Sequence, residues 1–176
     1  MRSLFATAIL LCLSACSGPI ETRVSSAGDT SIGALSYQLP ENADQKNPDL
    51  TVAKRLLVGA LAERNIRRTN SAPLLLQITL SQRAADLGLK KGDGAKAKII
   101  AAPKEKKAFQ SCQDKEYRLA IRFSKISDGA MVYAGDAAEY HCKASVADAL
   151  PAMVKVIVAD MDGPRGDKVL TRRGEE

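Results

Sequence analysis

The spacing of apolar residues in the segment "NPDLTVAKRLLVGALAERNI" predicts an amphipathic helix. Asn47 is a good N-cap, and Pro48 suits the first helical position. Apolar residues then recur at intervals of three and four, as one helix face requires: Ala53, Leu56, Leu57, Ala60 and Leu61. Asn65 can take the left-handed conformation that ends a helix, so that Ile66 folds back onto Leu61.

Alternating apolar and polar residues predict strands on both sides of this helix. A short strand is expected over 32–39 and a longer one over 73–83, in which every second residue is buried. A strand, a helix and a second strand in this order favour a right-handed crossover. The segment 116–142 reads as a hairpin that turns at Asp128-Gly129, with Gly135 as a candidate bulge.

A second helix is expected from the apolar stripe near the C-terminus, formed by Leu150, Met153, Val154, Ile157 and Met161. Ser145 or Asp148 can cap it, and Pro151 favours Asp148 because proline is tolerated only near a helix start. Residues 168–171 can add a last strand. The pattern therefore predicts an α+β, two-layer sandwich. Its sheet is mixed but mostly antiparallel, with four to five strands, and two helices pack on one face.

The N-terminus has the pattern of a secretory signal. Arg2 precedes an apolar run from Leu4 to Leu13, which is too short to span a bilayer. Leu13-Ser14-Ala15-Cys16 resembles a bacterial lipobox. The resemblance implies cleavage before Cys16, acyl chains such as palmitate on that cysteine, and an outer-membrane protein facing the periplasm, because serine follows it. The alternative is an ordinary signal peptide with an accidental cysteine.

Four regions follow from this interpretation. Residues 1–15 are a lipoprotein signal peptide, and residues 16–31 are a lipidated tether, since 17–31 are small, polar and aperiodic. Residues 32–172 form a single periplasmic α+β domain, and 173–176 are a polar tail.

Cys112 and Cys142 remain after Cys12 leaves with the signal and Cys16 takes lipid. An even remainder in an oxidising compartment predicts a disulfide. Two buried free thiols are the alternative. His141 is the only histidine, and the cysteines lack zinc-site spacing, so we expect no metal.

The segment 84–114 loses the regular pattern and is rich in lysine, alanine and glycine. Either a short edge strand forms at 96–101, or the segment is a mobile excursion. It is the candidate for contact with an anionic surface, and a solvated loop is the alternative. The lysines concerned are Lys90, Lys91, Lys96, Lys98, Lys104, Lys106 and Lys107. Aromatic residues make up 4% of the chain and tryptophan is absent, so we expect no nucleic-acid partner.

Several stretches resemble bacterial lipoproteins of domain-of-unknown-function family 4136. They are "DLTVAKRLLVGALAERNI", "APLLLQITL", "RFSKISDGAMVYAGDA" and "DALPAMVKVIVADMDGPRGDKV". The family has no assigned activity, so the resemblance implies a fold and no catalytic residue. Where the family has phenylalanine-proline-glycine after the last helix, this chain has Met161-Asp162-Gly163.

The sequence carries no nucleophile elbow and no phosphate-binding loop. "DMDG" at 160–163 lacks the later ligands of a calcium loop and is interpreted as a helix end. We therefore expect no catalytic residue and no cofactor. The favoured hypothesis is a non-catalytic envelope lipoprotein that acts as an adaptor for an envelope protein or an anionic polymer. A small-ligand-binding lipoprotein and a periplasmic hydrolase are the alternatives.

Overall fold

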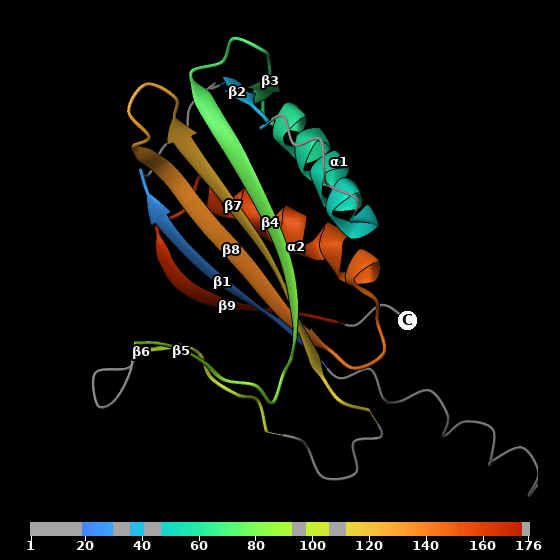
Figure 1. Ribbon diagram of the computed structural model, residues 1–176. Helices are drawn as coiled ribbons and strands as arrows, with labels where there is room; N and C mark the ends of the chain where they lie inside the picture. Colours follow the sequence, from blue (N-terminus) through green and yellow to red (C-terminus); the bar gives the residue numbers. More distant parts are fainter. Residues whose placement is uncertain (1–18, 30–35, 41–46, 93–97, 106–111, 174–176) are drawn as a thin grey trace, which may run out of the picture.

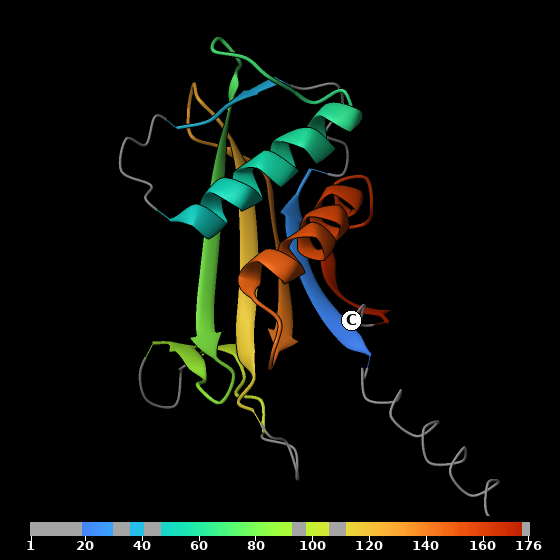
Figure 2. The same cartoon turned by 90° about the vertical axis from the view of Figure 1, so that its right-hand side faces the viewer.

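The chain folds into one seven-stranded sheet with two helices packed on one of its faces (Figures 1 and 2). This is a computed structural model, and it describes residues 19–29, 36–40, 47–92, 98–105 and 112–173. The strand order in the main sheet is β3-β2-β4-β7-β8-β1-β9, and β5 and β6 pair separately. The helices cover the middle of the sheet, and none of the described residues forms a helix on the opposite face.

The described elements have the following bounds. The helices are α1 (Pro48–Glu63) and α2 (Val146–Asp160). The strands are β1 (Ile20–Gly28), β2 (Ser36–Gln38), β3 (Arg67–Arg68), β4 (Leu74–Ala84), β5 (Leu89–Lys91), β6 (Lys98–Ala101), β7 (Lys115–Lys125), β8 (Met131–His141) and β9 (Gly166–Arg172).

The α+β, two-layer class predicted from the sequence is confirmed, and the strand number is corrected from four or five to seven in the main sheet. The sheet is mixed, because β2 is parallel to both β3 and β4 while every other pairing is antiparallel. Since β2 and β4 are parallel, α1 is the crossover between them. The extra strands are β1 and the two-residue β3, which carry no alternating run of large apolar residues.

Helix α1 begins and ends where the sequence predicted. The side-chain oxygen of Asn47 accepts from the backbone N–H of Asp49 at 3.0 Å and of Leu50 at 3.3 Å. Asn65 has a positive φ of 61°, and the N–H of Ile66 donates to the carbonyl of Leu61 at 3.0 Å. These contacts satisfy backbone groups that a helix end leaves unpaired.

Helix α2 starts earlier than predicted, because Ser145 and not Asp148 is its N-cap. Ser145 Oγ accepts from the N–H of Asp148, while the Asp148 carboxylate accepts from the N–H of Ser145 at 2.8 Å. This reciprocal capping box holds the first turn firmly. Pro151 lies inside the helix. The prediction favoured Asp148 as the cap because proline lacks a backbone N–H, and it did not take into account the two hydrogen bonds of the capping box.

The largest correction concerns the N-terminal tether, because residues 20–28 of the predicted tether form strand β1. This strand lies between β8 and β9 and pairs with both. Thr22 and Ser26 are buried on it beside Val24. The sequence looked like a linker because two of the three inward side chains are polar, and the partner of Thr22 is Glu139 on a strand far along the chain.

The β7–β8 hairpin forms, but its turn and its bulge differ from those predicted. Lys125 and Ala130 close the turn, so four residues lie between them rather than the predicted two. The register shift falls between Phe123 and Ser124 and not at Gly135. Gly135 has another function: a Cβ there would approach the hydroxyl oxygen of Tyr133 to 2.3 Å. Glycine therefore leaves room for the Tyr133 ring on the helix side.

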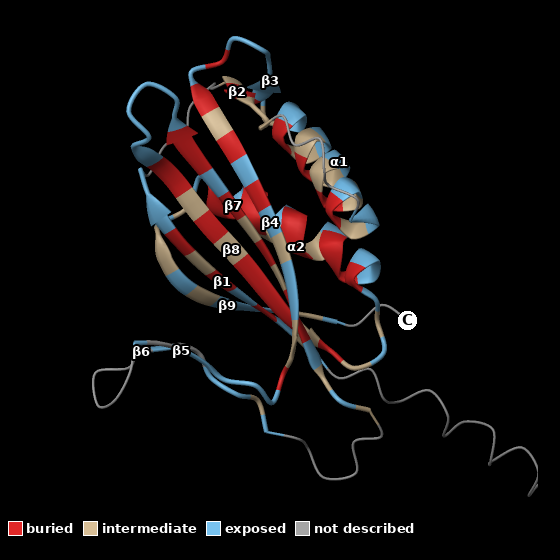
Figure 3. Ribbon diagram, in the orientation of Figure 1, coloured by how far each residue is buried: buried red, intermediate tan, exposed pale blue. Residues whose placement is uncertain are grey.

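The hydrophobic core lies between the helices and the sheet (Figure 3). Tyr37, Phe123 and Tyr133 are fully buried on β2, β7 and β8, and the Tyr37 and Phe123 rings meet edge to face with centroids 5.9 Å apart. Helix side chains fill the other half of this layer, among them Leu57, Leu61, Leu150, Met153 and Ile157. The helix side of the core is thus built from the apolar stripes that the sequence pattern predicted.

Candidate functional site

The open face of the sheet, opposite the helices, carries cross-strand rows of mostly polar side chains. One row joins Thr79, Ala120, Asp136 and Ser25, and the next joins Gln77, Arg122, Ala134 and Ala27. Each row crosses β4, β7, β8 and β1 in register. Because successive residues of a strand point to opposite faces, these are the positions between the core residues.

These two rows form a hollow of about 410 Å³ on the open face. The hollow exists because four of the side chains that line it are small: Ser25, Ala27, Ala120 and Ala134. The longer side chains of Gln77 and Arg122 also line the hollow, and both are exposed. The hollow therefore offers amide, hydroxyl and guanidinium groups in a setting open to solvent.

A series of ion pairs with alternating charges crosses the open face, from the end of β4 and the start of β7 to this hollow. Arg83 pairs with Glu116, Glu116 pairs with Arg118, and Arg118 pairs with Asp136. Glu116 is 3% exposed although it belongs to the uncovered face, because arginine side chains lie over it on both sides. In the described part of the chain Arg122 has no such carboxylate partner, so its charge is available to a ligand.

The two carboxylates of this series respond differently to their surroundings. Burial alone would raise the pKa of Glu116, but hydrogen bonds from Arg83 and Tyr140 and the charge of Arg118 bring that pKa below its usual value. For Asp136 burial dominates and raises the pKa in spite of Arg118, and the charges of Asp167 and Glu116 raise it further. Asp136 is therefore the more readily protonated group, and it lies in the hollow.

Near the end of β8, on the open face, the ring of Tyr140 contacts two cationic side chains. The guanidinium of Arg23 lies 4.9 Å from the centre of its ring, and the Lys104 ammonium lies 4.7 Å from it. Lys104 also pairs with Asp114 at 2.7 Å. Cation–π contacts of this kind fix the segment around Lys104 against the sheet.

Four of the seven lysines that the sequence grouped together lie in the described part of the chain, and three of these belong to the β5–β6 pair. Lys90 is exposed in β5, and Lys91 and Lys98 belong to β5 and β6. Lys104 is only partly exposed, and its charge is neutralised by Asp114, so it is not a free surface contact. Lys96, Lys106 and Lys107 lie outside the described residues, as does the lipidation candidate Cys16.

A second charged cluster is buried on the helix side of the sheet, around Glu139. This carboxylate is fully buried, and it accepts from Thr22 at 2.5 Å, from Arg172 at 2.8 Å and pairs with His141 at 2.7 Å. Burial opposes ionisation, but hydrogen bonds from His141, Arg172 and Thr22 lower the pKa of Glu139 to about 2. The cluster joins β1, β8 and β9, and its burial marks it as structural.

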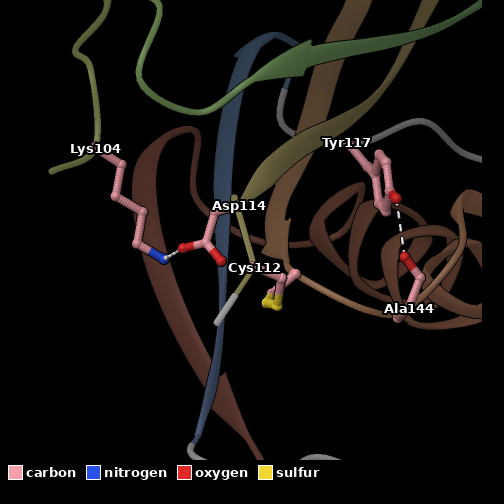
Figure 4. Close-up of a disulfide and its surroundings, with 6 residues drawn as sticks. Lys104, Cys112, Asp114, Tyr117 and Ala144 are labelled. Carbon is pink, nitrogen blue, oxygen red and sulfur yellow. Dashed lines mark hydrogen bonds and ion pairs between the residues drawn. A yellow bond between two sulfur atoms is a disulfide. The ribbon is translucent and has the colours of Figure 1, made fainter. Parts of the chain in front are cut away.

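Cys112 and Cys142 form the disulfide that the sequence predicted, with Cα atoms 5.6 Å apart (Figure 4). The bridge lies beside the Lys104–Asp114 ion pair. In the same region the Tyr117 hydroxyl donates to the carbonyl of Ala144 at 2.8 Å. The ring of Tyr117 stacks on His141 at 5.6 Å between centroids. These contacts fix the start of β7 and the end of β8.

Another hollow, of about 550 Å³, lies between α1 and α2 on the side away from the sheet. Its lining is largely apolar and includes Leu56, Gly59, Ala60, Pro151 and Val154. Neither of these two hollows lies in the core between the sheet and the helices.

Sequence reasoning missed the open-face site. Its members are single polar residues in four strands, and no local motif links them. The available signal was the alternation itself, since the same pattern that identifies Leu76 and Ile78 as buried also places Gln77 and Thr79 on the other face. The cross-strand rows could be identified only once the register of the four strands was known.

No family model and no curated protein matches this chain. Solved structures do share its fold. A PDZ domain protein from Parabacteroides distasonis matches with a TM-score of 0.58 and 11% identity over 88% of this chain, which spans only 39% of that protein. A PelC dodecamer from Paraburkholderia phytofirmans matches with a TM-score of 0.50 and 10% identity, over 80% of this chain and 97% of the other.

A minor lipoprotein from Acinetobacter baumannii is a more distant neighbour, with a TM-score of 0.41 and 10% identity over 73% of this chain and 93% of the other. At these identities the likenesses show the fold alone. Neither helix of the described residues is long and apolar enough to cross a bilayer.

Proposed function

We propose that this chain is a lipid-anchored protein of the bacterial envelope that binds a partner on the open face of its sheet and has no catalytic activity. The observation that carries the proposal is the contrast between the two faces. One face of the sheet is covered by the two helices, whereas the open face has a polar hollow and the exposed Arg122.

Anchoring is proposed at Cys16, on the outer membrane and facing the periplasm, with acyl chains on the cysteine. The lipobox supports it, and so does the disulfide between Cys112 and Cys142, because such bonds persist in the periplasm and are rare in the cytosol. The resemblance to lipoprotein family 4136 is consistent with this anchoring and remains a sequence-based prediction.

The anchoring is tested by Cys16→Ser. We expect this variant to accumulate as an unprocessed precursor and to leave the detergent phase in phase partitioning. The control is Cys12→Ser, which changes a cysteine of the signal peptide and keeps the lipobox cysteine. This variant should be processed and should partition like the wild type. Normal mature size and normal detergent partitioning of Cys16→Ser would contradict the lipoprotein assignment.

A binding role fits the open face better than catalysis does. Glu116 and Asp136 are held in ion pairs with arginines, and the His141–Glu139 pair is buried on the helix side. The groups left free in the hollow are an amide, hydroxyls and one guanidinium, which recognise polar or anionic partners. We propose an envelope protein or an anionic polymer as the partner.

The binding role is tested by filling the hollow. Thr79→Trp places a large side chain on an exposed position of its lining, and Thr51→Trp makes the same change on an exposed position of α1. After crosslinking in intact cells, partners captured by the wild type should be lost from Thr79→Trp and kept by Thr51→Trp. Equal capture by both variants would exclude the open face as the binding surface.

A small-ligand role is the second candidate, because about 410 Å³ lies within the usual size range of ligand pockets, roughly 300 to 1,000 Å³. Thermal-shift screening with small anions and sugars distinguishes the two. Stabilisation of the wild type but not of Thr79→Trp would favour a small ligand, and a screen of hydrolase substrates would test for turnover.

A further inference from the structure

We propose that the β5–β6 hairpin docks on anionic lipid headgroups of the membrane to which the protein is anchored. This proposal builds on the proposed lipid attachment at Cys16. It rests on four observations: the short distance from that cysteine to the fold, the end of the sheet at which the hairpin lies, its exposed apolar side chains, and its charge.

The fold begins almost at the lipid attachment site. Only Ser17, Gly18 and Pro19 separate Cys16 from Ile20, where β1 begins. A fully extended chain spans at most ~3.6 Å per residue, so the start of β1 lies within about 14 Å of the Cys16 Cα atom. The long tether expected from the sequence would have left the domain's orientation free, whereas this short one brings one end of the sheet to the membrane.

The hairpin belongs to that same end. The register across the sheet places Ala84 beside Lys115 and Lys115 beside His141, while Thr22 near the start of β1 lies beside Glu139. The last residues of β4, which lead into β5, are therefore level with the first residues of β1. Figures 1 and 2 both show the hairpin extending beyond this lower end.

The hairpin and the turn that leads into it expose apolar side chains that nothing in the described part of the chain covers. Leu87 is 59% exposed, Leu89 is 49% exposed and Ile99 is 58% exposed. An isolated two-stranded ribbon is only marginally stable in water. Apolar side chains on such a ribbon gain free energy when they enter the boundary between headgroups and acyl chains.

The charge of the same segment matches an anionic surface. Residues 84–115 contain eight lysines and four acidic residues: Asp86, Asp93, Glu105 and Asp114. Two of the charges cancel directly, in the Lys104–Asp114 pair. Among the described side chains, Lys90, Lys115, Lys143 and Arg173 are exposed at this end. Basic residues near an anionic bilayer are attracted to its negative surface potential.

The absence of tryptophan from the chain allows a site-specific test on the domain without lipid. The protein starting at Ser17 retains every described residue. Leu89→Trp puts the probe in the hairpin, and Ile126→Trp puts it on an exposed apolar position of the β7–β8 turn at the other end of the sheet. Vesicles are made of phosphatidylglycerol and phosphatidylethanolamine, or of phosphatidylcholine alone.

With the anionic vesicles, the emission of Leu89→Trp should shift to the blue, and that of Ile126→Trp should stay unchanged. The shift should fade as salt rises, because the Debye length falls from ~10 Å at 0.1 M to ~3 Å at 1 M. Adding Lys90→Glu should weaken binding by about fivefold or more, since loss of one basic contact is worth on the order of 1 kcal/mol.

Three results would overturn the proposal. One is an unchanged spectrum of Leu89→Trp with anionic vesicles, and another is an equal shift of both probes. The third is a shift of Leu89→Trp that grows with protein concentration without vesicles, which would mean that the hairpin pairs with a second copy. Because this domain carries no lipid, the outcome is independent of the Cys16→Ser experiment.

Discussion

Arg122 and Phe123 are adjacent in β7, yet one is exposed on the open face and the other is fully buried under the helices. The same alternation runs through β4, β8 and β1. The covered face is held by apolar packing around Phe123, and the open face is organised by ion pairs from Arg83 to Asp136. Stability therefore depends mainly on one face, which leaves the other free for recognition.

The largest expected difference between the faces comes from neighbouring truncations in β7. Phe123→Ala removes a ring that meets Tyr37 and Tyr133, and should lower the free energy of unfolding by about 3 to 5 kcal/mol. Arg122→Ala removes an exposed side chain and should change it by less than about 0.5 kcal/mol. Urea unfolding measures both. Similar losses for the two variants would contradict the division between faces.

Glu139 and Asp136, which lie on opposite faces of the sheet, should make opposite contributions to stability as pH changes. The pKa of Glu139 in the folded state, about 2, lies below its usual 4.5, so its stabilisation is complete above about pH 4.5 and is lost as pH falls through 2. The loss amounts to about 3 kcal/mol. The pKa of Asp136 is raised, so its ionised form is disfavoured by folding and protonation relieves that cost.

Glu139→Gln and Asp136→Asn separate these contributions. Glu139→Gln should cost about 3 kcal/mol at pH 7 and should flatten the fall of stability between pH 4.5 and 2. Asp136→Asn should change stability by less than about 1 kcal/mol, because the Arg118 pair is partly exposed. Unfolding by urea at a series of pH values measures both, and a large loss for Asp136→Asn would mean that the open face also carries the fold.

The smallest comparison removes one hydroxyl from each face of β8. The Tyr133 hydroxyl is buried and donates to Asp160 at 3.1 Å, so Tyr133→Phe should cost about 1.5 to 3 kcal/mol. The Tyr140 hydroxyl is half-buried among Arg23, Arg83 and Glu116, where water can replace it. Tyr140→Phe should cost less than about 1 kcal/mol. Thermal unfolding ranks the two, and the reverse order would contradict the comparison.

Local sequence determined much of the covered face. The cap at Asn47, the stop at Asn65 and the apolar stripe fixed α1, because these signals act within one or two helical turns. The alternation in β4 identified its buried residues for the same reason. The pairing of Cys112 with Cys142 followed from the count of cysteines and the inferred compartment, with no knowledge of the fold.

Tertiary structure alone decided what β1 is and where the charges lie. Thr22 is buried because Glu139, more than a hundred residues away, accepts its hydrogen bond, and no local pattern can encode such a partner. The row of Thr79, Ala120, Asp136 and Ser25 likewise exists only once four strands are in register. Side chains with local partners are predictable from sequence, whereas polar side chains that depend on cross-strand partners become interpretable only when the sheet has formed.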